Sequence, residues 1–152
     1  MGIASESTMK IVIQRVSKAA VEIDNRTHAA INRGLVLLCG FGHEDSDEIL
    51  QAMANKVANL RIFPDQNGRF HYSVLEIQGE VLVIPQFTLY ADTSKGRRPE
   101  FFAAMKPDCA ASFFDGFVAA LKNTGLNAVE QGVFAADMQV SLVNDGPVTI
   151  LV

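Results

Sequence analysis

The chain has 152 residues and few of the features that mark membrane or secreted proteins. No apolar run approaches the roughly 20 residues that a membrane-spanning helix needs, so a membrane protein is excluded. The first ten residues, MGIASESTMK, lack a basic segment and an apolar segment, so we expect no secretory signal and interpret residues 1–8 as a flexible leader. Two cysteines, Cys39 and Cys109, are too few for a disulfide framework and suit a reducing, cytoplasmic compartment.

Histidine is also scarce. His28, His43 and His71 are scattered without ligand spacing and no HExxH or CxxC motif is present, so we expect no metal and interpret each histidine as a surface or turn residue. The acidic cluster at 44–48 fits a helix start, where the dipole favours anions, better than a metal site. The sequence also lacks the Gly-x-Ser-x-Gly elbow, the P-loop and the dinucleotide-binding glycine pattern. Cys39 lies in an apolar run where burial makes a thiol inert, which argues against a cysteine nucleophile.

The composition of the chain is that of a globular domain. Hydrophobic residues make up 49% and charged residues 20% of the chain, and its length fits one domain with a real core. The net charge of −4 argues against a protein that coats nucleic acid. It still permits a protein that grips a single RNA end through a local basic patch.

Hydrophobic periodicity and turn residues predict one α+β domain over residues 9–152. We expect a twisted antiparallel or mixed sheet that closes into a barrel-like core, with two amphipathic helices packed on it. One helix is predicted over 44–60 and the other from Pro107 to Lys122, and PDQNG at 64–68 is predicted to be a turn. The strands are predicted near 10–16, 19–24, 27–32, 35–41, 80–92, 133–137, 138–143 and 147–152. The run at 35–41 is apolar at nearly every position, which predicts burial on both faces.

A proline interrupts the apolar run at 80–92. Pro85 has no N–H to give to a neighbouring strand, so the following backbone N–H groups of Gln86, Phe87 and Thr88 are candidates to point into a cleft. Free backbone donors that face a reacting carbonyl form an oxyanion hole. For Gln139 and Ser141, simple alternation on a half-exposed strand explains the polar residues equally well.

A second proline stands between two strand-like halves near the carboxyl end. Gly146 and Pro147 separate MQVSLV from VTILV, in a place where proline is confined to edges, bulges and turns. An ordinary tight turn is one interpretation. The other is a rigid corner that presents bare backbone carbonyls and so recognises a ligand by its shape.

At these residues the chain resembles the D-aminoacyl-tRNA deacylase family. The resemblance runs from Met9 to the carboxyl end and includes, in order, IQRV, RIFPD with its following NG, PQFTLYAD, GRRPEF and FAADMQVSLVNDGPVT. It implies hydrolysis of the ester between a D-amino acid and the 3′ end of tRNA, which keeps D-residues out of translation. Misattached glycine, being achiral, is also implied as a substrate. The family's fold is a barrel-like α+β domain, and no metal or cofactor is used.

The resemblance also assigns roles to particular residues. It implies a homodimer in which Gly146 and Pro147, joined by a cis peptide bond, reach into the partner's pocket. Their carbonyls would accept hydrogen bonds from the α-ammonium and leave no room for an L side chain. The backbone at Gln86, Phe87 and Thr88 would stabilise the oxyanion, with no side-chain nucleophile. The terminal adenosine is expected near Phe134, Met138 and Gln139. Lys95, Arg97 and Arg98 are either phosphate contacts or a solvated loop.

One position departs from the family pattern. The usual motif has serine where this chain has Pro85, and a related animal-type branch with proline there has a looser chiral filter. The carboxyl-terminal NDGPVT follows the D-specific pattern, which indicates the D-specific activity. Two alternatives remain: a deacylase with relaxed chirality because of Pro85, and a non-catalytic module that binds the tRNA end.

Overall fold

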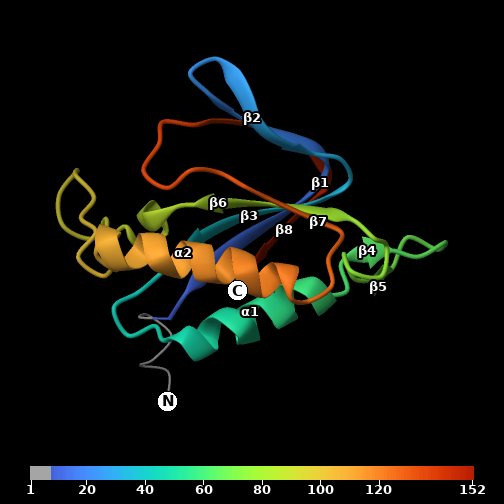
Figure 1. Ribbon diagram of the computed structural model, residues 1–152, viewed down its shortest axis with the longest axis horizontal. Helices are drawn as coiled ribbons and strands as arrows, with labels where there is room; N and C mark the ends of the chain where they lie inside the picture. Colours follow the sequence, from blue (N-terminus) through green and yellow to red (C-terminus); the bar gives the residue numbers. More distant parts are fainter. Residues whose placement is uncertain (1–7) are drawn as a thin grey trace.

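A long first strand organises the sheet in the computed structural model, which describes residues 8–152 (Figure 1). β1 (Lys10–Ile23) pairs with β2 (Arg26–Ile31), β3 (Gly34–Gly40) and β8 (Gln139–Leu151), all antiparallel. β3 continues in parallel to β6 (Glu80–Pro85), and β6 continues in parallel to β7 (Ala128–Gln131). The strand order is therefore β2-β1-β3-β6-β7 with β8 beside β1, a mixed sheet as predicted.

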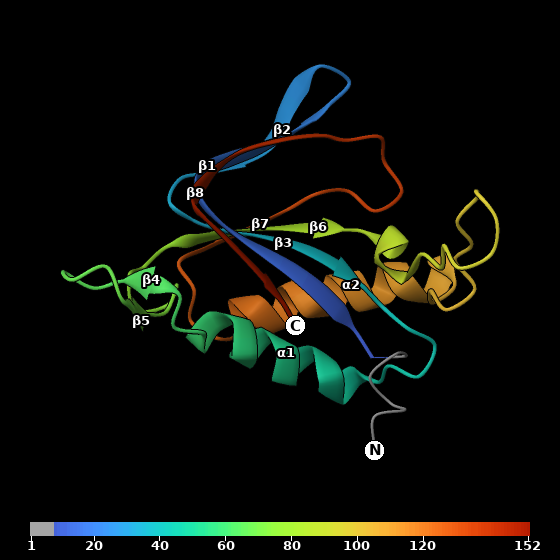
Figure 2. The same ribbon diagram turned by 180° about the vertical axis from the view of Figure 1, so that it is seen from behind.

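Two helices cover one face of this sheet, as both views show (Figures 1 and 2). They are α1 (Asp47–Asn59) and α2 (Pro107–Lys122). Their buried faces join alternate residues of β1, β3 and β6 in the main core, while the other alternate residues form a second core on the inner face of the curled sheet. β3 and β6 are consequently buried on both faces, as predicted for 35–41. Neither helix is long and apolar enough to cross a membrane, a statement limited to residues 8–152.

Several predicted boundaries are wrong. The runs 10–16 and 19–24 form the single strand β1, because register shifts against β8 reset the alternation near Val16. The runs 138–143 and 147–152 likewise form the single strand β8, which passes through the Gly-Pro step. No strand forms at 133–137, because a turn with Ala135 at φ 67° intervenes. The leader prediction falls on residues outside the described part, except Thr8, whose carbonyl accepts a hydrogen bond from Tyr90.

The predicted turn at 64–68 joins β4 (Phe63–Pro64) and β5 (Phe70–Tyr72), a short hairpin that the sequence patterns did not indicate. Asp65 closes it, since its Oδ1 accepts hydrogen bonds from the backbone N–H groups of Asn67 at 2.8 Å and Arg69 at 3.0 Å. The same two bonds lower the pKa of this exposed carboxyl.

Candidate active site

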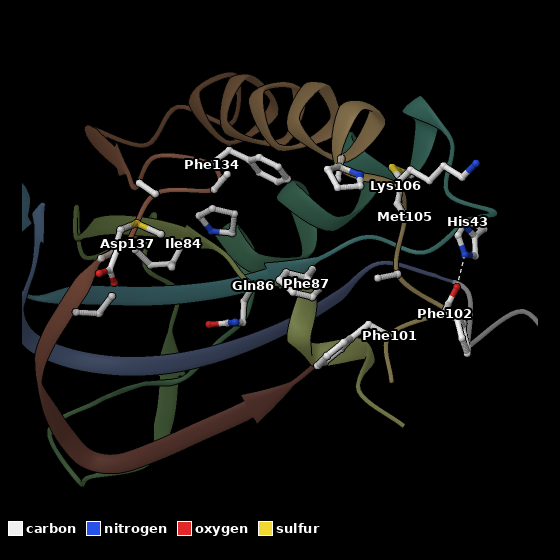
Figure 3. Close-up of a pocket in the computed structure, with 18 residues that line it drawn as sticks. His43, Ile84, Gln86, Phe87, Phe101, Phe102, Met105, Lys106, Phe134 and Asp137 are labelled. Carbon is white, nitrogen blue, oxygen red and sulfur yellow. Dashed lines mark hydrogen bonds between the residues drawn. The ribbon is translucent and has the colours of Figure 1, made fainter. Parts of the chain in front are cut away.

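A pocket of about 750 Å³ lies where β6 ends (Figure 3). Its walls are the end of β6 with the following residues, the segment before α2, and the segment that leads into β8. The sequence-predicted site residues among its lining are Pro85, Gln86, Phe87, Phe134 and Met138. The lining is mostly apolar with a few polar groups, the usual character of a small-molecule site.

Pro85 ends β6 and the chain then turns, so the predicted strand over 80–92 is wrong beyond this residue. A short 3-10 helix, η2 (Phe87–Tyr90), follows. The N–H of Gln86 donates to the Cys39 carbonyl at 2.7 Å, so the expectation of a free donor at Gln86 is also wrong. The N–H groups of Phe87 and Thr88 belong to the first turn of η2, where no helical acceptor precedes them. They make no hydrogen bond within residues 8–152.

The side chains of this segment support its conformation. The Nε2 of Gln86 donates a hydrogen bond to the Thr88 hydroxyl, so the two predicted polar residues contact each other. Phe87 is half-exposed and packs edge-to-face against Phe101, with ring centroids 5.1 Å apart. Two backbone donors therefore lie beside an aromatic wall at the pocket edge.

The opposite wall contains the residues predicted to contact the adenosine. Phe134 and Met138 line the pocket, and Gln139 follows at the exposed start of β8 without being part of the lining. Gly132 holds this segment close to β6, because its N–H donates to the Val83 carbonyl at 2.8 Å. An added Cβ there would lie 2.7 Å from the Met138 sulfur, so the Met138 side chain, which lines the pocket, would have to shift.

The Gly-Pro step lies elsewhere in the same protomer. Gly146 and Pro147 are joined by a cis peptide bond, as the resemblance implied, and neither lines the pocket. Arg15 holds this corner: its Nε donates to the Asp145 carbonyl at 3.0 Å and its Nη1 to the Ile62 carbonyl at 2.7 Å. At β-strand rise, the seven residues from Gln139 to Gly146 span up to about 23 Å. The corner is outside the pocket lining of its own protomer.

The basic cluster also lies outside the pocket. Lys95, Arg97 and Arg98 are exposed on a loop that two hydrogen bonds between Asp92 and Glu100 close at its base. These side chains make no hydrogen bond or ion pair within the described residues, and none lines the pocket.

The titratable groups near the pocket do not supply an obvious nucleophile. Cys39 is buried, and burial raises the pKa of its thiol far above the ordinary value. The pKa of the Tyr90 hydroxyl is also raised, first by burial and then by the nearby Asp45 carboxylate. No group of three His, Cys, Asp or Glu side chains that could hold a metal occurs within residues 8–152. Backbone donors are thus the groups best placed to act on a carbonyl.

The sequence analysis missed part of the lining. His43, interpreted as a surface or turn residue, is exposed but lines the pocket, and its Nε2 hydrogen-bonds to the Phe102 carbonyl. Lys106 and Asp137 line it too. These residues come from connecting segments, where no periodicity marks them; on this wall, the resemblance included only Phe101, the last residue of GRRPEF.

Comparison with known proteins identifies the chain's relatives. The profile of the D-Tyr-tRNA(Tyr) deacylase family matches residues 12–152. A D-aminoacyl-tRNA deacylase of Thermosipho africanus (strain TCF52B) is 50% identical over 143 residues, which are 94% of this chain and 95% of that protein. A solved structure described as c-Myc DNA unwinding element binding protein superposes with a TM-score of 0.87 at 39% identity, over 94% of this chain and 97% of that one.

A second structure, of a probable eukaryotic D-amino acid tRNA deacylase, has a TM-score of 0.84 at 16% identity and covers 95% of this chain and 98% of that one, which shows the shared fold. The predicted α+β architecture with its nearly closed sheet is thereby confirmed. The family match spans all but the first 11 residues, and the identity to the Thermosipho africanus relative extends over nearly the whole of both chains. The chain therefore belongs to the D-Tyr-tRNA(Tyr) deacylase family, hydrolases that cleave D-aminoacyl-tRNA in translation quality control.

Proposed function

We propose that this pocket binds the 3′ end of D-aminoacyl-tRNA and that backbone groups at its edge catalyse the hydrolysis. Water attacks the ester carbonyl, the oxyanion forms, and the ribose oxygen leaves with a proton. The observation that carries the proposal is the pair of unbonded N–H groups at Phe87, which lines the pocket, and at Thr88, the next residue, which is not part of the lining. Each donor in an oxyanion hole contributes roughly 10²–10³ in kcat.

The Gln86 side chain positions this segment in the proposal. Its amide donates to the Thr88 hydroxyl, which leaves that oxygen with a lone pair for water or the ribose hydroxyl. Pro85 has no hydroxyl, so position 85 supplies no nucleophile. Positioning and electrostatic stabilisation then account for the rate, without a covalent intermediate.

Chiral selection in this proposal requires a second copy of the chain. Gly146 and Pro147 of one protomer would enter the partner's pocket, where their carbonyls accept the α-ammonium and exclude an L side chain. Two observations support a homodimer: the corner lies away from its own pocket, and β8 has one unpaired edge within the described sheet. β8 also exposes Val143 and Leu151, whereas exposed long edge strands are normally covered.

The remaining tRNA contacts follow from the layout of the pocket. The terminal adenosine would stack against Phe134 and Met138, with Gln139 at its border. Lys95, Arg97 and Arg98 are free to contact phosphates of the acceptor stem. We place the enzyme in the cytoplasm, where aminoacyl-tRNA is used.

Glycyl-tRNA is a further proposed substrate, because a filter that acts on the side chain does not reject an achiral amino acid. Pro85 lines the pocket floor, and its ring in place of a serine side chain alters the space near the amino acid. A relaxed rejection of small L-amino acids is the alternative outcome at this position.

Deacylation of D-tyrosyl-, L-tyrosyl- and glycyl-tRNA by the purified protein tests the proposal. We expect release of D-tyrosine and glycine and retention of the L-ester, and L-alanyl-tRNA reports the effect of Pro85. Thr88→Ala should lower kcat about tenfold, the effect of one lost hydrogen bond. Thr27→Ala, an exposed threonine on β2, is the matched control and should leave kcat unchanged. Retention of D-tyrosyl-tRNA without cleavage would instead indicate a binding module.

A further inference from the structure

A histidine and a lysine side chain lie at one end of the pocket, here called the basic end, and the mechanism above uses neither. His43 follows β3, and Lys106 immediately precedes α2. The backbone holds their segments together, because the Met105 N–H donates to the Phe41 carbonyl at 2.8 Å and Gly42 forms a bridge with Ala104. Figure 3 shows both side chains at the same end of the pocket.

The charges that line the pocket are segregated. Asp137 lies at the opposite end, and Gln86 and Phe87 lie between it and the basic end (Figure 3). Glu44 follows His43 and Asp108 lies two residues after Lys106, but neither carboxylate lines the pocket. The Lys106 ammonium makes no hydrogen bond or ion pair with any residue from 8 to 152. The basic end is therefore available to an anion of the ligand.

An aminoacyl-adenosine at the end of RNA carries its phosphate on the ribose 5′ carbon, away from the base. If the base lies against Phe134 and Met138 and the ester at Phe87, the phosphate would extend toward the end of the pocket that contains His43 and Lys106. We propose that Lys106, assisted by His43, binds the 5′-phosphate of the terminal adenosine. This inference rests on the proposed function and adds to it one charged contact that anchors the nucleotide.

The two side chains suit this role in different ways. A lysine ammonium binds phosphate as a flexible point charge. The imidazole of His43 is oriented by the hydrogen bond between its Nε2 and the Phe102 carbonyl, and its protonated form presents the other ring N–H. Lys106 makes the main contribution, because its ammonium has no protein partner within residues 8–152.

Two small substrates isolate the contact: the 3′-O-D-tyrosyl esters of adenosine and of adenosine 5′-monophosphate. We expect wild-type kcat/KM to favour the phosphorylated ester about tenfold, the effect of one charge-assisted hydrogen bond. Lys106→Met should bring this preference close to one, mainly through KM, and His43→Gln should reduce it in part. Higher salt should weaken the wild-type preference, since partly exposed charges are screened.

Lys122→Met is the matched control, because Lys122 is exposed at the far end of α2. It should keep the wild-type preference. If the wild type cleaves both esters equally, or if Lys106→Met keeps the full preference, the phosphate contact is refuted while the hydrolase stands. If the wild type cleaves neither ester and leaves D-tyrosyl-tRNA intact, the proposed function fails instead.

Discussion

Replacing Arg15 by methionine tests what holds the Gly-Pro corner in place. The arginine is only 7% exposed, and its guanidinium donates to the carbonyls of Ile62 and Asp145. Methionine keeps most of the aliphatic stem but leaves both carbonyls without this donor. Hydrogen bonds to a charged group contribute about 1.5–3 kcal/mol each. The partly exposed Asp145 carboxylate, 3.5 Å from Nε, adds at most about 1 kcal/mol.

The thioether recovers part of this loss through apolar burial, so we expect Arg15→Met to lower the free energy of unfolding by about 2–4 kcal/mol. For a chain of this length, thermal unfolding followed by circular dichroism should show Tm roughly 5–15 °C lower. Arg33→Met is the matched control: both guanidinium groups lie over the Phe63 ring, with Cζ 6.0 Å from its centroid for Arg15 and 5.4 Å for Arg33, but Arg33 is exposed. Its effect should stay within about 0.5 kcal/mol.

The same two variants can also be compared by their hydrolysis of D- and L-tyrosyl-tRNA. If the corner at Gly146 selects chirality in the partner's pocket, Arg15→Met should lower the ratio of D- to L-tyrosyl-tRNA hydrolysis, while Arg33→Met keeps it. Equal melting temperatures and equal ratios for the two variants would refute the idea that the buried hydrogen bonds of Arg15 hold the corner.

Three further predictions follow from close contacts and burial. Gly40→Ala places a Cβ 2.9 Å from the Gln86 carbonyl, so kcat should fall by up to about 100-fold while the protein stays folded; an unchanged kcat would contradict a role for this segment. Gly34→Ala places a Cβ 1.7 Å from a backbone carbonyl of β6 and should lower the free energy of unfolding by about 3 kcal/mol or more in a denaturant titration, an effect that normal stability would disprove. A thiol reagent should modify only Cys109 in the native protein, because burial raises the pKa of the Cys39 thiol; rapid reaction of both thiols would argue against this burial.

Elements that form because of residues close together in the sequence were predicted from those residues. The proline at position 107 and the apolar stripe placed α2 at its observed bounds, Pro107–Lys122. The all-apolar run at 35–41 predicted a strand buried on both faces, because a strand with one face in water would alternate polar and apolar residues. The turn at 64–68 was predicted because Asp65 and Gly68 suit the conformations that it requires.

Features that depend on distant partners were not predictable. Arg15 lies in an alternating strand, and its burial depends on carbonyls 47 and 130 residues away. The backbone N–H of Gln86 is not free because it donates to the carbonyl of Cys39, which belongs to another strand. The pocket wall that contains His43 and Lys106 is built by connecting segments, whose sequences carry no period. Family resemblance identified the Phe87 and Phe134 segments, but only the fold brings them to one pocket.

β8 connects both halves of the proposed assembly within a single strand. Val140, near its start, lines the pocket, and the corner at 146–147 lies six residues further on. The register of its pairing with β1 fixes the position of each residue of β8, since a slip of one residue would turn every side chain to the opposite face. Insertions or deletions between 140 and 146 are therefore far less tolerable than changes of side chain, because they alter the spacing between the two half-sites rather than their chemistry.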